Sequence, residues 1–373
     1  MRFTVSRENL LKALQIVVGV IERRQTIPIL SHVWISLSSQ ALKLMGTNNE
    51  ITIMSTSAVN QTIQEGVTTV PAHTLFEICN RFPEGALLSC MQEKDQFTIE
   101  FDKIRFQLLS LPAQDFPSSS FSTSASRFEV KANSLLKALK KTAFAVAQQD
   151  ARQYLNGMLW SIQEGQLRLL ASNGHILASK TIAIGSDQNK SVIVPRKMIA
   201  ELSRLLGDVE EKVVISMTDH HIEIKDTHYH IISGLLSGSF PDYKQLLPDP
   251  SMVQTAVIER DHLKSALHRQ SALMKNIDYK GIQLQLSENL LKLVVSNRNL
   301  GYGEEQFPIQ YTPKNQELFS IAFSIDYLDK ILDVLSPGLI NLILPLHEGV
   351  TLIEQFNNQD HLYMIMPMLL GSK

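Results

Sequence analysis

The residues best suited to chemistry are four histidines in one short stretch. His228 and His230 are two residues apart, so they share a face if they lie on a strand, and His220 and His221 precede them. Imidazole is a common zinc ligand, but a structural zinc site needs four protein ligands and a catalytic site three. No third ligand has a clear position in this stretch. Solvated strand histidines are therefore the favoured interpretation, and we expect no metal site.

Other patterns that indicate catalysis are missing from the sequence. It has no glycine-rich phosphate loop, no His-Glu-x-x-His, no nucleophile elbow and no Cys-x-x-Cys. Cys79 and Cys90 lack metal-ligand spacing, and carboxylates such as Asp249 and Glu259 have no spacing that favours acid–base catalysis. We expect no enzyme activity, no catalytic residue and no cofactor. An enzyme stays the competing class, and metal analysis with a pH-dependent hydrolysis screen would distinguish the two.

Basic side chains recur in segments with helical periodicity. In residues 133–149, Lys137 and Lys141 fall on a different face from the apolar residues, and the segment contains no acidic residue. Residues 196–206 and 261–275 carry similar surpluses, although the whole chain has 35 Lys and Arg against 37 Asp and Glu. One such helix is most simply a solvated face. Recurrence in several helices favours a shared basic surface that contacts phosphates rather than bases.

These segments belong to a helix that begins three times. Residues 3–14 read FTVSRENLLKAL and residues 128–139 read FEVKANSLLKAL, at a constant offset of 125, and a weaker copy, AVIERDHLKSAL, occupies residues 256–267. Each copy is an alternating strand, a polar cap and apolar residues at helical spacing. Self-similarity at about one third of the length predicts three repeats.

Each repeat has the same order of elements. Val70-Pro71 and Val194-Pro195 open second helices at an offset of 124. We predict helices at residues 9–20, 72–81, 133–149, 196–206, 261–275 and 324–335. Strands are predicted at residues 33–37, 42–45, 51–55, 97–101, 104–108, 167–172, 281–286, 291–295, 340–344, 350–354 and 362–366. The fold class is α+β, with two helices packed on antiparallel sheet in each repeat. The Ser- and Thr-rich residues 118–126 are predicted to be a linker.

Composition places the chain among soluble proteins. It has 373 residues, 44% of them hydrophobic and 19% charged, which is ordinary for a protein with full cores. Charged residues such as Arg7 and Lys12 interrupt any signal-peptide core, and the apolar run at residues 16–21 is too short to span a membrane. With two cysteines and no disulfide pattern, we expect a cytoplasmic protein that does not interact with membranes.

These features together resemble the bacterial DNA polymerase III beta subunit family, the sliding clamps. The resemblance covers nearly the whole chain. It rests on five segments in order: residues 149–158 (QDARQYLNGM), 172–175 (SNGH), 192–197 (VIVPRK), 240–243 (FPDY) and 363–368 (YMIMPM). It implies three consecutive DNA-clamp domains at residues 1–120, 127–248 and 252–373.

The resemblance implies a DNA sliding clamp. Two protomers would join head to tail into a homodimeric ring around duplex DNA, without sequence specificity, and so confer processivity. Its implied partners are the catalytic subunit of DNA polymerase III, the clamp loader and other proteins with clamp motifs. The alternative is a repeat scaffold that binds peptides but not DNA, and retention on closed DNA circles would distinguish them.

The resemblance also implies three sets of site residues. Residues expected to face the duplex are Arg24, Lys137, Lys141, Gln149, Arg152, Tyr154, Arg196, Lys197 and Arg204. Residues expected to form a peptide groove are Leu155, Ser172, Gly174, His175, Leu177, Pro241, Tyr327, Met366, Pro367 and Met368. The implied dimer seam places Phe106 and Leu108 against Leu273 and Met274.

The sequence departs from the family pattern at a few of these positions. Ile176 and Leu369 stand where Arg is familiar, and Gln245 replaces another basic residue, so we expect a groove that is more apolar and less basic. At the seam, Thr74 stands where relatives often carry Lys, and residues 300–303 (LGYG) replace an acid-rich segment. The ion pairs at its rim are therefore expected to differ, although exposed pairs contribute only about 0–1 kcal/mol each.

Overall fold

A computed structural model describes residues 1–39, 41–117, 126–186, 188–274, 280–314, 318–347 and 349–369. The predicted linker lies outside this range except for Ser126, as do Lys275 and the last residues, 370–373. The chain forms two compact units. Unit 1 comprises Met1–Asn133 and Lys197–Leu235, and unit 2 comprises Ser134–Arg196 and Leu236–Lys373.

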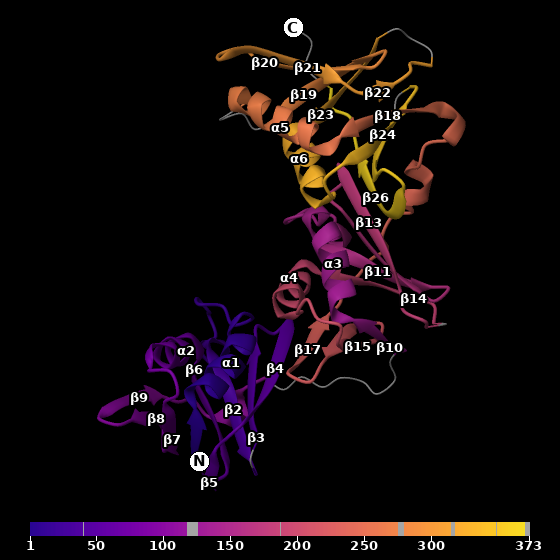
Figure 1. Ribbon diagram of the computed structural model, residues 1–373. Coiled ribbons are helices and arrows are strands. Elements are labelled where there is room, and N and C mark those ends of the chain that lie inside the picture. The colour runs from indigo at the N-terminus through magenta and orange to yellow at the C-terminus, as the bar shows by residue number, and fades with distance from the viewer. Residues whose placement is uncertain are drawn as a thin grey trace. The chain divides into compact units, whose positions relative to one another are not determined.

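Unit 1 contains two antiparallel sheets, with α1 packed against α2 and against β3 and β4 (Figure 1). Its helices are α1 (Arg7–Val18), α2 (Ala72–Arg81) and, but for its first residue, α4 (Arg196–Leu205). One sheet has the order β5 (Gln61–Gln64), β1 (Arg2–Ser6), β7 (Leu87–Glu93), β8 (Gln96–Phe101) and β9 (Ile104–Leu109). The other has the order β6 (Gly66–Pro71), β2 (His32–Ser38), β3 (Ala41–Thr47), β4 (Ile51–Ala58), β17 (Tyr229–Gly234), β16 (His221–Lys225), β15 (Lys212–Met217) and β10 (Ser126–Lys131).

Unit 2 also contains two antiparallel sheets, and α5 packs against α6. Its helices are α3 (Ala132–Thr142), from Ser134 onward, α5 (Arg260–Ser271) and α6 (Ile325–Val334). The larger sheet has the order β14 (Lys190–Pro195), β11 (Gly157–Gln163), β12 (Gln166–Ser172), β13 (Ile176–Ala183), β26 (Asn358–Ile365), β25 (Thr351–Gln355), β24 (Leu339–Pro345), β18 (Val253–Glu259) and β22 (Gln310–Tyr311). The smaller has the order β21 (Gly301–Pro308), β20 (Leu290–Asn297), β19 (Gly281–Ser287) and β23 (Phe319–Ser324).

The larger sheets of the two units have the same strand order, and this explains why the units cross the repeat boundaries. In unit 1, β4 of the first repeat pairs with β17 of the second, and in unit 2, β13 of the second repeat pairs with β26 of the third. Each larger sheet is thus shared by two consecutive repeats. The predicted fold class is confirmed: each of three repeats contributes two helices and antiparallel strands.

The helices follow from capping and apolar spacing. Ser6 caps α1, because its side chain accepts a bond of 3.3 Å from the Asn9 amide, so the helix begins two residues before the predicted start. Leu10 and Leu14 are buried in α1, and Leu135 and Leu139 are fully buried in α3. The predicted second helix of the first repeat, residues 72–81, coincides with α2.

Two predicted helices end several residues earlier than expected. α3 ends at Thr142 rather than at residue 149, and the Thr142 hydroxyl donates to the Ala138 carbonyl oxygen at 2.8 Å. Such a bond back to the preceding turn is a local alternative to continuing the helix. α5 ends at Ser271 rather than residue 275, because the Ala272 amide is shared between the carbonyls of Arg269 and Gln270 and the chain tightens into a 3-10 turn, Ala272–Met274. In the described part of the chain, no helix has the length and apolar character needed to cross a bilayer.

Candidate functional site

Most residues predicted to form a groove meet in unit 2, where β13 pairs with β26. Leu177 lies opposite Met364, and Ile176 lies opposite Ile365. Ile176 is only 2% exposed, so the residue that stands in place of a familiar Arg points into the core rather than into the groove. This pairing joins strands that are almost 190 residues apart in the sequence, and it sets which side chains of the two strands lie opposite one another.

A tight turn before β13 forms one end of the groove. The Ser172 hydroxyl donates to the Ile176 carbonyl oxygen at 2.8 Å and accepts from the Gly174 amide at 3.1 Å. The Asn173 side-chain oxygen accepts from the amides of His175 and Ile176, each at 3.0 Å. Gly174 has φ +87°, a conformation that favours glycine. These bonds hold His175 exposed at the tip of the turn.

The last described residues form the opposite wall. The Met366 amide donates to the His175 carbonyl oxygen at 2.8 Å, and the Met368 amide donates to the Ala322 carbonyl oxygen at 2.7 Å. The His175 ring stacks on the Tyr327 ring, with centroids 5.7 Å apart. Met366 and Pro367 remain exposed. The residues predicted to form the groove therefore combine exposed side chains of Met366 and Pro367 with a backbone that is already hydrogen-bonded.

Beneath the predicted groove lies a buried apolar cluster that sequence reasoning missed. The cluster consists of apolar side chains gathered around the β13–β26 pairing. Its buried members are Leu170, Leu177, Val350, Leu352 and Met364. The partly buried side chains packed against them are Leu159, Phe240, Tyr243, Ile343 and Leu362. Strand alternation could have identified their shared face within each strand. Their convergence depends on long-range pairing, which alternation alone does not give. Pro241 is exposed between two of these aromatic residues.

The loop that precedes β11 lies against the groove. The Arg152 guanidinium makes a two-bond contact with Asp150, with Nε–Oδ1 3.0 Å and Nη2–Oδ2 2.9 Å. This hydrogen bonding lowers the pKa of the Asp150 carboxyl to about 2. A Cβ atom on Gly174 would lie 2.7 Å from Arg152 Nη2, so the guanidinium covers the turn. Tyr154 packs edge-on against Phe240, with centroids 6.2 Å apart, and Leu155 is buried.

The basic residues of unit 2 differ in how exposed they are and in whether they already bind a partner within the chain. Lys137 is exposed and forms no ion pair within the described residues. Lys141 is half-buried, and its pKa is lowered, mainly by burial and then by the charge of Lys180. Arg196 is exposed, and the Gln148 amide, with its oxygen turned toward the guanidinium, accepts bonds of 3.1 and 2.7 Å. Gln149 is exposed and has φ +55°.

The basic residues of unit 1 are mostly engaged. The Arg204 guanidinium donates to the carbonyl oxygens of Gln15 and Ile16 at 2.9 and 2.8 Å, and so binds the carboxyl end of α1. Lys197 lies between the carboxylates of Glu22 and Glu50, at 3.2 and 3.3 Å. Arg24 is exposed. Arg204 is thus bound to the end of α1. That these basic residues face a duplex stays a prediction.

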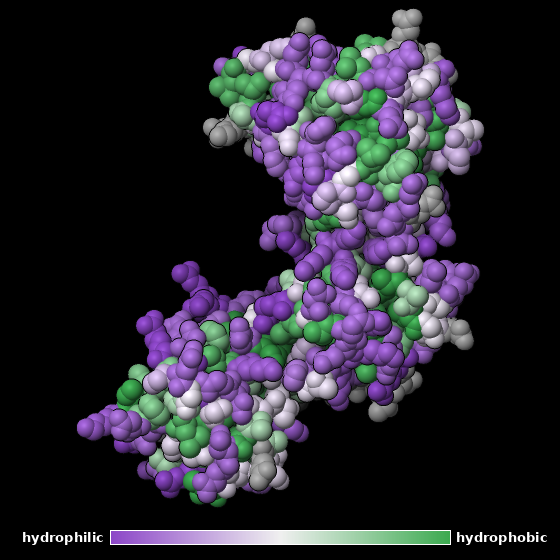
Figure 2. Space-filling view, in the orientation of Figure 1, coloured by the Kyte–Doolittle hydropathy of each residue, from purple (hydrophilic) through white to green (hydrophobic). Residues whose placement is uncertain are grey.

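The predicted seam residues lie beside edge strands. β9 is an edge of its sheet, and Phe106 on it is 41% exposed while packing edge-on against Phe82. Hydrophobic surface lies over β9, beside the hydrophilic tip of the β8–β9 hairpin (Figure 2). Leu108 and Leu273 are half-buried, whereas Met274 is 5% exposed within its own chain. The seam itself stays a prediction.

The four histidines at residues 220–230 lie on or beside β16 and β17, in the larger sheet of unit 1. His230 pairs with Glu223, and burial lowers the pKa of its imidazole although the Glu223 carboxylate acts in the opposite direction. His220 and His221 are exposed at a turn held by Thr218. Within the described residues, no three His, Cys, Asp or Glu side chains are grouped so that they could hold a metal ion.

Three family models match consecutive parts of the chain. They describe the N-terminal, central and C-terminal domains of the DNA polymerase III beta subunit, and they match residues 1–120, 129–242 and 244–369. Together they leave out only a few residues between the repeats and at the end of the chain.

Whole proteins and solved structures match over the same length. The beta sliding clamp of Pseudomonas aeruginosa is 38% identical, and that of Escherichia coli is 34% identical, each over 99% of this chain and 100% of the relative. The crystal structure of the DNA polymerase III subunit beta from Pseudomonas aeruginosa has a TM-score of 0.95 at 36% identity, covering 99% of this chain and 100% of that chain. A second structure of that clamp, bound to griselimycin, has a TM-score of 0.94 at 37% identity with the same coverage.

Proposed function

The chain belongs to the DNA polymerase III beta subunit family, the beta sliding clamps, and from this we propose that it is a DNA sliding clamp. Two copies join head to tail into a ring around duplex DNA. The ring tethers the replicative polymerase and other DNA-processing proteins through the peptide groove of unit 2. The ring makes DNA synthesis processive, because a closed ring cannot leave the duplex sideways even when each contact is weak.

The observation that carries this proposal is the threefold repeat. Two chains of three repeats each supply six similar domains, so a rotation of about 60° per domain closes the ring. Closure matters because a head-to-tail contact that does not close continues into a filament. The edge strand β9, with exposed Ile104, Phe106 and Leu109, supports a seam at one end of the chain. Pairing there would also cover a strand edge that otherwise invites aggregation.

The charge distribution supports contacts that are the same at every base pair. The chain has a formal net charge of −2, so attraction to DNA must come from local surfaces rather than from the whole molecule. Exposed residues such as Arg24 and Lys137 suit phosphate contacts, which carry no sequence information. A protein that slides needs contacts of this kind, because readout of base edges would hold it at particular sequences.

The groove supports binding of short linear motifs from several partners. Its walls carry exposed Met366 and Pro367 and half-buried Met368, and methionine side chains repack easily around different ligands. We propose the catalytic subunit of the polymerase and the clamp loader as ligands of this groove. The protein acts as an accessory factor without a catalytic residue, metal or cofactor, and it works in the cytoplasm, where the bacterial chromosome is replicated.

The proposal is tested by retention on DNA circles. The protein is loaded by an ATP-driven clamp loader onto closed circular duplex DNA, and the complex is separated from free protein by gel filtration. We expect the protein to stay on the closed circle and to be lost after a restriction enzyme cuts the DNA. A scaffold that binds only peptides would never associate with the circle, and a sequence-specific binder would remain after the cut. Either result would contradict the proposed function.

A further inference from the structure

The groove of unit 2 has a counterpart in unit 1 to which the proposed function assigns no role. Reading from β6, the larger sheet of unit 1 runs β6-β2-β3-β4-β17-β16-β15-β10, and that of unit 2 runs β14-β11-β12-β13-β26-β25-β24-β18-β22. Apart from the additional strand β22, the strands correspond one to one. The pairing of β4 with β17 therefore corresponds to the pairing of β13 with β26.

One row of side chains crosses both sheets at this place. In unit 2 the row runs through Leu159, Leu170, Ser179 and Leu362, which are successive partners on β11, β12, β13 and β26. Three of these side chains belong to the apolar floor of the groove. In unit 1 the corresponding row, defined by the same register, runs through Trp34, Met45, Met54 and His230 and continues to Lys225 on β16.

The sequence repeat supports this correspondence. Trp34 and Leu159 are 125 residues apart, and so are Met45 and Leu170. This is the offset of the repeated helix. The row in unit 1, Trp34, Met45, Met54, His230 and Lys225, is called the methionine row below.

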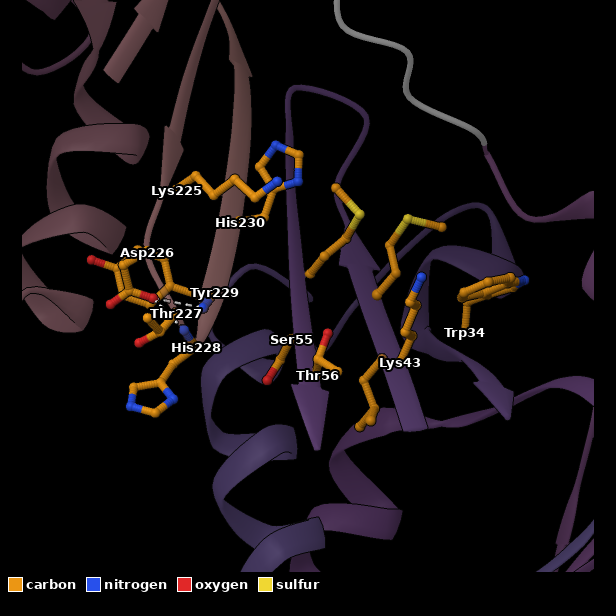
Figure 3. A pocket seen from close by; sticks show the side chains of 13 residues that line it. Trp34, Lys43, Ser55, Thr56, Lys225, Asp226, Thr227, His228, Tyr229 and His230 are labelled. Carbon is orange, nitrogen blue, oxygen red and sulfur yellow. Dashed lines mark hydrogen bonds between the residues drawn. The ribbon is translucent and has the colours of Figure 1, made fainter. Parts of the chain in front are cut away.

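The two rows differ in what covers them. In unit 2, Phe240 and Tyr243 pack against the floor, and Arg168 Nη1 donates to the Tyr243 hydroxyl at 2.8 Å. The residue that corresponds to Arg168 in unit 1 is Lys43, again at an offset of 125. There, the methionine row lines an open cavity of about 470 Å³. Figure 3 shows Trp34 and Lys43 on one side of this cavity and Lys225 and His230 on the other.

The charged side chains that line the cavity are Lys43, Lys225 and Asp226, so positive charge exceeds negative charge. Lys43 and Lys225 are exposed, and within the described residues neither forms an ion pair. The Asp226 carboxylate, by contrast, accepts from the amides of His228 and Tyr229 at 2.5 and 2.9 Å. The Glu223 carboxylate pairs with His230. Two lysines and one carboxylate thus line the cavity, and the lysines are free to pair with an acidic ligand.

We propose that this cavity is a second peptide-docking site, which takes an extended acidic peptide with one apolar side chain. Neighbouring strands lie about 4.8 Å apart, so the methionine row places the Trp34 and Lys225 backbones about 19 Å apart across five strands. An extended peptide covers that distance in about six residues. The apolar side chain packs between the indole of Trp34 and the two thioethers, and an acidic residue near the other end pairs with Lys225.

The chemistry of the methionine row suits this ligand. Thioether side chains are flexible and polarizable, so they fill the space around differently shaped apolar groups. An indole presents a large flat surface at little entropic cost. The two lysines favour acidic sequences, in the way that charge complementarity usually selects partners. The contrast between the indole at one end and Lys225 at the other sets the direction of the peptide. The site lies entirely within unit 1 and is separate from the groove of unit 2.

Tryptophan fluorescence tests the proposal directly. The chain has two tryptophans, and Trp160 is fully buried, so Trp34 reports on the cavity. The probe is a seven-residue peptide with a leucine near its amino end, two aspartates near its carboxyl end, and no aromatic residue. Titrated into the full-length protein at low salt, it should change the tryptophan emission saturably. Lys225→Glu should weaken binding about fivefold, because it replaces an attraction with a repulsion.

Three controls make the result decisive. Lys94→Glu, on the β7–β8 turn, should leave the affinity unchanged, and a peptide with lysines in place of the aspartates should not bind. A chain that lacks residues 366–373 should still bind, so failure of the groove of unit 2 is distinguishable from failure of this site. Affinity that is equal in Lys225→Glu and the parent overturns the proposal. So does self-association that Met54→Glu abolishes, because a second copy of the chain would then be the occupant.

Discussion

At the scale of single residues, pairing decides which basic side chains a phosphate can reach. Arg204 binds the end of α1, and Arg152 is held by Asp150, although both were predicted to face a duplex. Lys137 and Arg24 are exposed. Exposed ion pairs are worth only about 0–1 kcal/mol, so a duplex can compete for Arg152. It competes less well for Arg204, whose two backbone bonds also support a helix end. Residue type and spacing alone could not separate these cases.

The Asp150–Arg152 contact gives a prediction about pH. The pKa of Asp150 is about 2 in the folded protein, below its ordinary value, because the Arg152 side chain and amide hydrogen-bond the carboxylate. The contact therefore stabilises the loop fully above the ordinary carboxyl range, and this support is lost as pH falls toward 2. In Arg152→Ala, the pKa of Asp150 should rise toward its ordinary value, measured by NMR titration of the side-chain carboxyl carbon. A pKa that stays at about 2 would show that Arg152 is not the cause.

Gly174 gives a prediction about the turn at the groove. Its φ of +87° is unfavourable for residues with a Cβ, and a Cβ would also displace the Arg152 guanidinium. Gly174→Ala should lower the free energy of unfolding by about 1–2 kcal/mol and weaken clamp-motif peptides. Urea denaturation and calorimetric titration measure the two effects. Gly234→Ala is the matched control, because its site is open and lacks positive φ, and it should be neutral or slightly stabilising.

At the scale of elements, local sequence signals predicted well which helices and strands exist and in what order. They predicted less well the residues at which some helices end. The alternating residues 104–108 and the Pro-initiated helix at residues 72–81 were confirmed, because each depends on neighbours in the sequence. The end of α3 was wrong because apolar residues such as Val146 continue the helical period after Thr142 has turned its hydroxyl back to Ala138. The groove floor was missed for another reason. It forms only when β13 pairs with β26, and no local pattern encodes that register.

The end of the chain after β26 gives a prediction at this scale. Removing residues 366–373 deletes the wall that is bonded to His175 and Ala322, but it leaves the β13–β26 pairing intact. The truncated protein should remain dimeric by sedimentation and should no longer bind clamp-motif peptides in a fluorescence anisotropy assay. Met366→Ala, which keeps the backbone bond, should lose only part of the affinity. Undiminished peptide binding in the truncation would reject the site assignment.

At the scale of the whole molecule, the repeat explains both function and its local variation. Each larger sheet is built from two consecutive repeats, so one register produces the groove in unit 2 and the methionine row in unit 1. The two sites then diverge through single positions, such as Arg168 in one and Lys43 in the other. Repetition supplies similar surfaces, and substitution at corresponding positions changes the side chains that they carry. The remaining question at this scale is how two copies of the chain meet.

The edge strand β9 provides the prediction that tests the ring. Phe106 is 41% exposed on this strand, and a charge there would be buried without a partner at a seam with a second chain. Phe106→Asp should therefore give a monomer at micromolar concentration by analytical ultracentrifugation, with an unchanged circular dichroism spectrum. It should also lose retention on closed DNA circles, because an open chain leaves the duplex sideways.

Ile63→Asp is the matched control, since Ile63 is 54% exposed on β5, at the opposite edge of the same sheet. In a head-to-tail ring only one of these edges meets the partner, so the Ile63 variant should stay dimeric and stay on the circle. Dimers of both variants would place the seam elsewhere, and retention of a monomeric Phe106 variant would mean that enclosure is not the basis of activity.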